Sequence, residues 1–258
     1  MSAPGVIAVI GLGEAGSAIA ADLVAAGVTV RGWDPVREAP EGVQPAQGEA
    51  DAARGAAIVL SLNSASVAVE VAESAAPGLE PDALFADLNT AAPAVKRAAA
   101  QAVRADFADV ALLGAVPGRG VSTPALVSGP GAERFAEALG PLGMPVTPGG
   151  AEVGDASARK LARSVFAKGL AAAVGESLEA ARALGCEDWL YADIESTLTT
   201  ADAALLRRLV EGSRLHAGRR VDEMEAAVAL LEELGVEPRV ASATAQWLRS
   251  LARTEVGG

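Results

Sequence analysis

The sequence predicts an α/β fold in which an N-terminal Rossmann-type domain, built on a doubly wound parallel sheet, precedes a smaller all-helical C-terminal domain. Three observations lead to this prediction. Short apolar runs alternate with alanine-rich helical stretches in the first half of the chain, a pattern typical of a parallel sheet covered by helices. A glycine-rich segment directly follows the first apolar run. Beyond about residue 151, every long segment has a helical pattern.

The apolar runs of the first half are expected to be strands. They cover residues 6–10, 28–33, 57–62, 84–88, 110–113 and 125–128. A parallel sheet buries both faces, so its strands are apolar throughout rather than alternately polar and apolar. The run Val6–Ile10 has this continuous apolar character. Residues 14–26 are expected to form the first helix, which ends at Gly27.

Prolines and glycines interrupt the chain at residues 145–150, and only helices are expected beyond them. We therefore predict two domains, residues 1–150 and 151–258. The helices of the second domain are expected at residues 155–184, 188–198, 201–216, 219–234 and 241–252. Gly169 and Gly175 are weak points of the first of these helices, because glycine lowers helix stability.

The composition excludes several classes of function. Hydrophobic residues make up 51% of the 258 residues, which is ample for a core, and the net charge of −12 argues against binding to nucleic acid or an anionic membrane surface. No apolar run reaches the roughly 20 residues that span a bilayer, and no basic signal-peptide start is present. One cysteine, Cys186, and one histidine, His216, predict no internal disulfide, no tetrahedral zinc site and a cytoplasmic protein, and no spacing of carboxylates indicates a magnesium site.

The segment Gly11-Leu12-Gly13-Glu14-Ala15-Gly16 matches the G-x-G-x-x-G pattern of dinucleotide-binding proteins. It follows an apolar strand and opens a helix, as this chemistry requires. The first glycine permits a tight turn, the second lets a pyrophosphate approach the backbone, and the third allows the helix to pack closely on the strand. The phosphates then lie at the helix N-terminus. The alternative is a glycine-rich turn without a ligand.

Other cofactor contacts are expected at the ends of three further strands. Asp34 lies 18 residues after Gly16, where an acidic residue binds the adenosine ribose hydroxyls. Its charge would repel a 2′-phosphate, so NAD(H) is slightly favoured over NADP(H), although Arg37 has the reach to bind that phosphate. The remaining expected contacts are Leu62 and Asn63 after the third strand, and Asn89 and Thr90 after the fourth.

Three segments carry a resemblance to a known family. Residues 10–16 are similar to its G-L-G-x-M-G segment, residues 87–93 to its D-x-S-T-x-x-P segment, and residues 154–164 to its G-x-x-x-x-x-K-x-x-N-N helix. The sequence thus resembles the β-hydroxyacid dehydrogenase superfamily, which includes 6-phosphogluconate dehydrogenase, 3-hydroxyisobutyrate dehydrogenase and, more distantly, the imine reductases. The second half resembles a short branch with a 6-phosphogluconate dehydrogenase-like helical domain. The resemblance implies a nicotinamide-dependent oxidoreductase in which Lys160 is the general acid/base.

The chain departs from the family pattern at three substrate-binding positions. Residues 109–115 resemble the family's D-A-P-V-S-G-G segment, but Leu113 stands in place of a serine that helps to hold a substrate carboxylate. Arg163 and Ser164 stand in place of the two asparagines of the lysine-bearing helix. The resemblance therefore does not identify the substrate.

A basic stripe is expected around the implied catalytic lysine. Lys160, Ser164 and Lys168 recur every four residues and share one helix face, with Arg163 beside them. The stripe is either a solvated surface or part of an active site. In the second case, a lysine would take up the proton released by hydride transfer from an alcohol. Neighbouring cations and partial desolvation would lower the lysine pKa toward neutrality, and the same cations would suit an anionic substrate.

The segment after the strand near residue 113 is expected to contribute to the substrate pocket. Its candidate substrate-binding residues are Leu113, Gly114, Ser122 and Thr123. Arg119, in the same segment, is either a clamp for a carboxylate or phosphate or an exposed loop residue. His216 either contributes to a site, including one formed across a dimer, or is a partly buried helix-terminal residue, and Cys186 is expected to be packed rather than nucleophilic.

Three functions remain open from the sequence. The first is an NAD(P)-dependent oxidoreductase acting on a hydroxyl or carbonyl of a small anionic molecule. The second is an imine reductase that uses the same cofactor on a C=N bond, and the third is a non-catalytic dinucleotide-binding protein. The helical second half is rich in alanine and leucine and offers apolar faces to a second copy, so a homodimer is expected.

Overall fold

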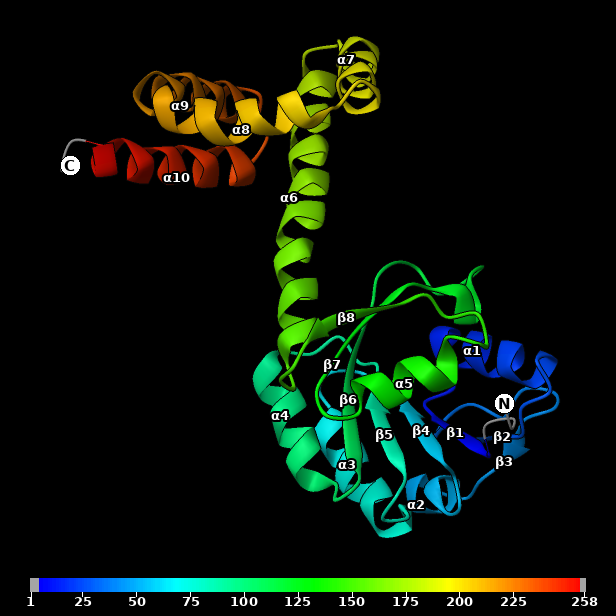
Figure 1. The fold of residues 1–258 in the computed structure, drawn as a ribbon. Coiled ribbons are helices and arrows are strands. Elements are labelled where there is room, and N and C mark those ends of the chain that lie inside the picture. Colours follow the sequence, from blue (N-terminus) through cyan, green and yellow to red (C-terminus); the bar gives the residue numbers. More distant parts are fainter. Residues whose placement is uncertain (1–4, 256–258) are drawn as a thin grey trace. The chain divides into compact units, whose positions relative to one another are not determined.

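The computed structural model describes residues 5–255, and these form two compact units, residues 5–163 and 164–255 (Figure 1). The last strand ends at Gly150 and the helical part of the chain begins at Asp155. The start of helical structure thus agrees with the sequence pattern. The division into domains at 150/151 stays a prediction, because the compact units divide within a helix.

One mixed sheet organises the first unit. Within the described residues its strands are β1 (Ile7–Ile10), β2 (Val30–Trp33), β3 (Gln44–Pro45), β4 (Ile58–Ser61), β5 (Leu84–Asp87), β6 (Asp106–Leu112), β7 (Ala125–Ser128) and β8 (Val146–Gly150). Their order across the sheet is β3-β2-β1-β4-β5-β6-β7-β8. The strands from β3 to β6 are parallel. The chain reverses its direction of travel across the sheet between β1 and β4, which is where such sheets bind ligands. The predicted fold class is confirmed.

The sheet differs from the expectation at its edges. Strand β7 runs antiparallel to β6, and β8 pairs in parallel with β7, so the sheet is not parallel throughout. Strands β3 and β8 were not expected, and residues 145–150 had been interpreted as a break. Both strands contain a proline, Pro45 and Pro148, and both lie at the two edges of the sheet. Edge strands tolerate proline because one side of an edge strand has no pairing partner for a backbone N–H.

Helices cover both faces of the sheet, as a doubly wound fold requires. They are α1 (Glu14–Ala25), α2 (Glu49–Ala53), α3 (Ala68–Ala75), α4 (Pro93–Ala102) and α5 (Ala132–Leu139). Ile7 and Val9 of β1 share a buried cluster with residues of α1 and α5. Ala8 and Ile10, the alternate residues of the same strand, share a second cluster with residues of α2, α3 and α4. The continuous apolar pattern of β1 therefore reflects burial on two faces.

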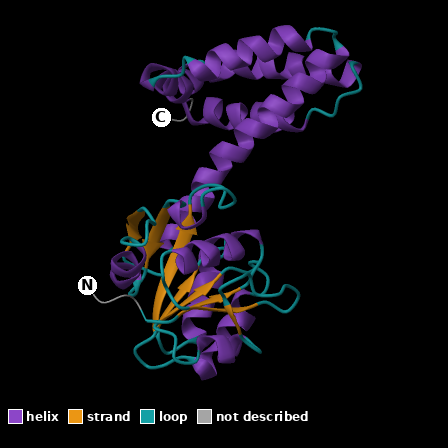
Figure 2. Ribbon diagram, turned by 90° about the vertical axis from the view of Figure 1, so that its right-hand side faces the viewer, coloured by secondary structure: helices purple, strands orange, loops and turns teal. Residues whose placement is uncertain are grey.

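The second unit is helical throughout (Figure 2). Helix α6 (Asp155–Ala183) runs from the first unit into it and is followed by α7 (Glu187–Thr199), α8 (Ala203–Leu215), α9 (Ala217–Glu233) and α10 (Arg239–Glu255). Gly169 and Gly175 do not interrupt α6. Between residues 5 and 255, no helix combines the length and the apolar character that crossing a membrane requires.

Candidate dinucleotide site and lysine centre

The glycine-rich segment after β1 has the geometry that its spacing predicts. Gly11 has a φ of +96°, which L side chains rarely adopt. A Cβ on Gly16 would lie 1.8 Å from the carbonyl oxygen of Gly11, so the third glycine is required by close packing. A Cβ on Gly13 would meet no atom within 4 Å, so the backbone there is open to a ligand. Glycine thus serves packing at Gly16 and leaves open space at Gly13.

The residues between these glycines begin the first helix. Gly13 precedes α1, which starts at Glu14, and no side chain caps this helix end. Leu12 is buried, Ala15 is half-buried and Glu14 is exposed. Uncapped N–H groups and the helix dipole favour an anion at this end. The open Gly13 backbone and the uncapped helix fit a dinucleotide pyrophosphate.

Asp34 follows β2 and organises the turn beside this segment. Its Oδ2 accepts a hydrogen bond from Leu12 N at 2.8 Å, and its Oδ1 accepts bonds from Val36 N and Arg37 N, each at 2.9 Å. Partial burial alone would raise the pKa of Asp34, but these three backbone N–H groups and the Arg37 charge lower it below its usual value. The carboxylate therefore stays charged at neutral pH.

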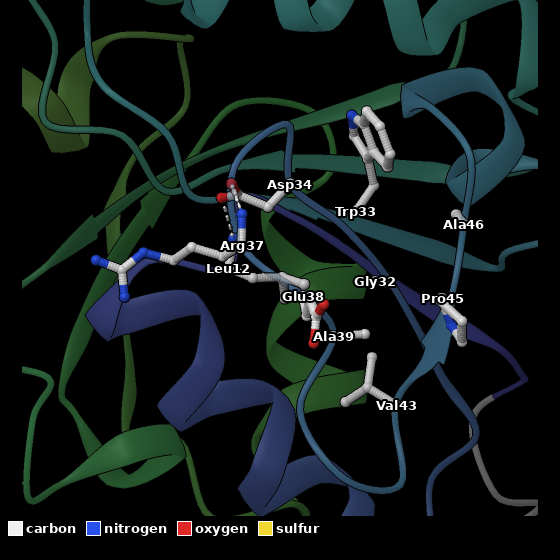
Figure 3. A pocket seen from close by; sticks show the side chains of 10 residues that line it. All are labelled: Leu12, Gly32, Trp33, Asp34, Arg37, Glu38, Ala39, Val43, Pro45 and Ala46. Atoms are coloured by element: carbon white, nitrogen blue, oxygen red, sulfur yellow. Dashed lines mark hydrogen bonds between the residues drawn. The ribbon is translucent and has the colours of Figure 1, made fainter.

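A pocket of about 400 Å³ lies beside Asp34 (Figure 3). It is lined by Leu12, Gly32, Trp33, Asp34, Arg37, Glu38, Ala39, Val43, Pro45 and Ala46. Figure 3 shows the Arg37 side chain extending from the turn that Asp34 holds. The indole Nε1 of Trp33 is buried and has no hydrogen-bond partner among the described residues. The expected ribose-binding acid and the basic residue next to it thus line one pocket.

The ends of β4 and β5 are joined by an amide network. Asn89 Oδ1 accepts a hydrogen bond from Asn63 N, and Asn89 Nδ2 donates to Ser61 Oγ at 3.2 Å. Asn63 Nδ2 donates to Ile10 O at 3.2 Å, and Leu62 N donates to the same oxygen at 2.8 Å. The structure therefore brings these expected cofactor residues together at the carboxyl ends of the central strands. Asn89 is buried, and both polar atoms of its side chain are used within the protein.

Lys160 and Thr90 lie 70 residues apart in the chain but meet in the first unit. Lys160 Nζ donates a hydrogen bond to Thr90 Oγ1 at 2.7 Å. Thr90 follows the carboxyl end of β5. Gly11 and Asn63 follow the carboxyl ends of the neighbouring parallel strands β1 and β4. Lys160 is half-buried in the second turn of α6. The implied acid–base lysine thus lies on the side of the sheet that bears the expected cofactor residues.

A buried charged cluster that lies at β5 and β6 was not predicted from the sequence. Lys96 of α4 is fully buried, and its Nζ lies 3.3 Å from Asp87 Oδ1 and 3.3 Å from Asp109 Oδ1. It also donates to Asp87 O at 2.7 Å. Burial raises the pKa of Asp87 above its usual value, although the Lys96 charge and the Asn89 N–H offset part of this effect. A signal was available, because Lys96 lies three residues before Ala99 on the inner face of α4.

Asp109 connects this cluster to the start of α6. Its Oδ2 accepts hydrogen bonds from Gly154 N and Ser157 N, each at 3.1 Å, and from Ser128 Oγ at 3.2 Å. Its Oδ1 accepts a bond from Ser157 Oγ at 2.6 Å. Asp109 is fully buried within β6. The sequence signal for this role was a carboxylate flanked by apolar residues, Ala108 and Val110, in the middle of the strand.

The expected substrate segment between β6 and β7 is held by a contact with Asp22 of α1 and by a hydrogen bond within the segment. Val121 N donates to Asp22 Oδ2 at 2.8 Å, and a Cβ on Gly120 would collide with the same carboxylate. Thr123 is fully buried and its hydroxyl donates to Gly120 O at 2.9 Å. The other candidates are half-buried Leu113 and exposed Gly114, Arg119 and Ser122. A Cβ on Gly114 would lie 3.4 Å from Arg119 Nη1, so these two residues are neighbours.

The remaining candidates lie on helices. Arg163 and Lys168 are exposed and Ser164 is half-buried on the continuous helix α6. His216 is exposed between α8 and α9, and Cys186 is a free cysteine before α7. Across residues 5–255, no group of three or more His, Cys, Asp or Glu side chains is arranged to hold a metal ion.

Comparison with known families agrees with this geometry. The family described as the NAD binding domain of 6-phosphogluconate dehydrogenase matches residues 6–147. The chain belongs to this family. A second family, a domain of unknown function (DUF1932), matches residues 181–251. The NAD-binding domain thus contains the glycine segment, Asp34 and the amide network, whereas Lys160 follows it in the chain.

Individual relatives extend the comparison. An uncharacterized 28.5 kDa protein in the 7S RNA 5′ region of Methanothermus fervidus is 30% identical over 142 residues, which is 55% of this chain and 55% of that protein. The chain thus matches about half the length of this curated relative. The conserved protein MTH1747, described as structurally similar to 3-hydroxyacid dehydrogenases, is 28% identical with a TM-score of 0.63, over 97% of this chain and 98% of that one.

Imine reductases share the fold. A V8 variant of the Myxococcus stipitatus imine reductase in complex with NAD+ has a TM-score of 0.81 and 23% identity, over 98% of this chain and 95% of that chain. The imine reductase of the same organism in complex with NADP+ gives the same TM-score and identity, over 96% and 94% of the two chains. The similarity to these enzymes is a similarity of fold.

Proposed function

We propose that this protein is an NAD(P)-dependent oxidoreductase that transfers a hydride between nicotinamide and a hydroxyl or carbonyl of a small anionic substrate. One observation carries the proposal. In a chain with a family-assigned NAD-binding domain, Lys160 Nζ lies 2.7 Å from Thr90 Oγ1, beyond the carboxyl end of β5. Open α/β sheets bind their ligands outside the carboxyl ends of the strands. Lys160 therefore lies on the side of the sheet where a substrate would face the bound cofactor.

Different residues would bind different parts of the cofactor. The open backbone at Gly13 and the uncapped N-terminus of α1 would hold the pyrophosphate, and Asp34 would accept hydrogen bonds from the adenosine ribose hydroxyls. Asp34 Oδ2 accepts one backbone bond, so this oxygen keeps a lone pair for a ribose hydroxyl. Asn63 and Thr90 would flank the nicotinamide ribose. Asn89 supports them from the core, because its amide already bonds to Asn63 N and Ser61 Oγ.

Lys160 supplies the proton that balances hydride transfer. The nicotinamide, when bound, supplies the hydride for reduction or accepts it in oxidation. In reduction, Lys160 Nζ gives a proton to the carbonyl oxygen as that oxygen becomes a hydroxyl. In oxidation, neutral Lys160 takes the hydroxyl proton. Thr90 Oγ1 holds the ammonium in place through their hydrogen bond. Arg163 and Lys168 are exposed cations on the same helix and favour an anionic substrate.

The experiment tests a panel of candidate substrates and measures turnover of each as the loss of NAD(P)H absorbance. We expect turnover with one or more short 2- or 3-oxoacids or related aldehydes, and no turnover with cyclic imines. Turnover with cyclic imines alone would replace the proposal with imine reduction. Tight binding of NAD(P)H without turnover of any carbonyl or imine would indicate a non-catalytic dinucleotide-binding protein.

The imine reductase alternative has its own support. Leu113 occupies the position at which the resembled family has a carboxylate-holding serine, and the chain has the fold of imine reductases. The same Lys160 ammonium would then protonate the nitrogen of a C=N bond. The oxoacid and imine arms of the panel distinguish the two activities directly.

Cofactor choice gives a first quantitative prediction. NAD(H) should bind more tightly than NADP(H), with a Kd ratio of about two- to tenfold, because a 2′-phosphate would lie against the charged Asp34 carboxylate. Arg37 partly offsets this repulsion, so Arg37→Ala should weaken NADPH binding further and leave NADH binding nearly unchanged. Both constants can be measured by the quenching of protein fluorescence.

A matched control uses an arginine that does not line the pocket beside Asp34. Arg54 is exposed and makes an ion pair with Asp51, so Arg54→Ala should change neither constant. Tighter binding of NADPH than of NADH by the unmodified protein would show that Arg37, rather than Asp34, decides the preference.

We further propose that the protein is a homodimer formed through its helical part. Within the described residues, all large hydrophobic side chains that are exposed, except Val36, lie at or after Leu161. Phe166 of α6 and Trp189 of α7 are 68% and 67% exposed. Large contiguous apolar surfaces on a single chain mark interaction sites, and a two-fold dimer is the commonest way to cover such a surface.

Light scattering should therefore give a mass near twice the 25.7 kDa of one chain. Phe166→Glu should shift the protein toward the monomer, because a charge would replace an aromatic ring in the interface. Val36→Glu is the matched control, since Val36 is 89% exposed in the first unit, and it should leave the mass unchanged. A monomeric unmodified protein at micromolar concentration would contradict the proposal.

A further inference from the structure

The buried charged cluster has an asymmetry. Lys96 lies between two carboxylates at equal distance, but they serve different segments. The carboxylate of Asp87 contacts Asn89 N and Lys96, and its Oδ2 has no hydrogen-bond partner among the described residues. Both oxygens of Asp109 are engaged, and they accept bonds from the first turn of α6. Asp87 therefore uses one carboxylate oxygen as an acceptor, whereas Asp109 uses both.

The position of the first turn of α6 determines where Lys160 lies. Ser157 precedes Lys160 by three residues, so the two lie on neighbouring turns of one helix face. Ser157 donates to Asp109 through both its backbone N and its Oγ, and Gly154 N donates to the same carboxylate. The backbone N–H groups among these donors are ones that a helix N-terminus otherwise leaves unsatisfied. Lys96 supplies the positive charge that permits an ionised carboxylate in this buried position.

We propose that Asp109 is a positioning residue for Lys160, which fixes the start of α6 so that Lys160 Nζ meets Thr90 Oγ1. The proposal deepens the proposed function and rests on it for its catalytic meaning. The geometric part stands separately, because the reactivity of Lys160 can be measured without any substrate.

The chain is suited to such a measurement because it contains three lysines, Lys96, Lys160 and Lys168. Trace acylation by acetic anhydride, followed by mass spectrometry, reports the reactivity of each amine. Lys168 is exposed and serves as the internal reference. Lys96 is fully buried and should react only on unfolding, so it reports whether each variant is folded. Thr90→Val, which removes the hydroxyl that Lys160 contacts, sets the rate expected when this contact is lost.

Two isosteric variants form a matched pair. Asp87→Asn and Asp109→Asn each remove one carboxylate charge from Lys96 and leave the other. In Asp87→Asn, the new amide can keep the Oδ1 acceptor and place its NH2 group where Oδ2 of Asp87 has no partner among the described residues. In Asp109→Asn, the new amide must turn its NH2 group against either the N–H donors of α6 or the Lys96 ammonium. Only Asp109→Asn should therefore release the helix start.

We expect Asp109→Asn to raise the acylation rate of Lys160, relative to Lys168, at least about fivefold, toward the Thr90→Val value, because a hydrogen bond to a charged group is lost. Asp87→Asn should change this rate less than about twofold. If Asp109→Asn does not fold, which labelling of Lys96 would reveal, Ser157→Ala removes one of the bonds more gently and should give an intermediate rise.

An unchanged Lys160 rate in folded Asp109→Asn and Ser157→Ala would overturn the proposal. Equal effects of Asp87→Asn and Asp109→Asn would also overturn it, since they would indicate a charge effect without positioning. Once a substrate is known, Asp109→Asn should lower kcat while leaving the Kd for NAD(P)H unchanged. A labelling effect without any turnover in the unmodified protein would contradict the proposed function and leave the positioning role in place.

Discussion

Replacing Lys160 with alanine should lower kcat at least about a hundredfold, with a range of roughly 10²–10⁴ for removal of a general acid/base. The reduced bond needs a proton, and Lys160 Nζ is the group that the site offers next to Thr90, at 2.7 Å. The affinity for NAD(P)H should change little, because the proposed dinucleotide contacts lie at Gly13 and Asp34. Kinetics with the substrate found in the panel, together with fluorescence titration of NAD(P)H, measure both quantities.

The choice of replacement sharpens this test. Lys160→Arg should rescue poorly, because a guanidinium stays protonated and cannot accept a proton in the oxidative direction. Lys168→Ala is the comparison variant: Lys168 is exposed on the same helix two turns further on, so its loss should raise KM for an anionic substrate and leave kcat nearly unchanged. Near-normal turnover of Lys160→Ala combined with a loss in Lys168→Ala would transfer the acid–base role to Lys168.

Replacing Lys96 with methionine should destabilise the first unit by about 3–5 kcal/mol, the effect typical of breaking a buried ion pair. Methionine fills a similar volume, so the loss comes from charge. Asp87 and Asp109 would remain buried without a cation. This free energy corresponds to a fall in Tm of roughly 6–20 °C for a unit of this size. Lys168→Met, at an exposed position, should stay within about 0.5 kcal/mol of the unmodified protein.

Trp33 offers a way to follow this unit by itself. The chain contains three tryptophans, and Trp189 and Trp247 lie in the second unit. In a background with both of these replaced by phenylalanine, Trp33 fluorescence reports unfolding of the first unit. The double variant Lys96→Met/Asp87→Asn should recover part of the lost stability, because it removes one uncompensated carboxylate. A Lys96→Met variant no less stable than Lys168→Met would contradict the prediction.

The same cluster predicts the sign of a pH effect. The pKa of Asp87 is raised in the folded protein, chiefly by burial, so the folded state holds that proton more tightly than the unfolded chain. The stabilising contribution is complete below the usual aspartate pKa and is lost as pH rises through the raised value. Lys96→Met removes the cation that opposes this shift. Its destabilisation should therefore be larger at about pH 8 than at about pH 5.

Local patterns in the sequence were enough to predict the geometry of the glycine-rich segment. The spacing of Gly11, Gly13 and Gly16 requires a tight turn, open backbone and close helix packing, and each requirement is met where the sequence places it. The position of Asp34 directly after β2 was predictable for the same reason, since it follows from the lengths of one helix and one strand, and its binding of ribose stays a proposal. The apolar runs predicted the inner strands, and the change of texture near residue 151 predicted the start of the helical part.

Tertiary structure alone decided the strand directions at the edge and the environment of the lysines. Strands β7 and β8 reverse direction, although their residues give no sign of it, because direction depends on how the connections cross the sheet. Thr90 and Lys160 lie 70 residues apart, and Asp109 lies 48 residues from Ser157. No periodicity connects such pairs.

Lys96 and Lys160 show the difference most directly. The sequence assigned chemistry to Lys160 through a family resemblance and passed over Lys96, although both are lysines on helices. Burial separates them: Lys96 is fully enclosed with two carboxylates, whereas Lys160 is half-buried against a threonine hydroxyl. Helix periodicity predicts which residues share a face, but the side chains that contact this face come from strands distant in the sequence. Their charge and hydrogen bonds then determine whether a lysine supports the fold or exchanges a proton.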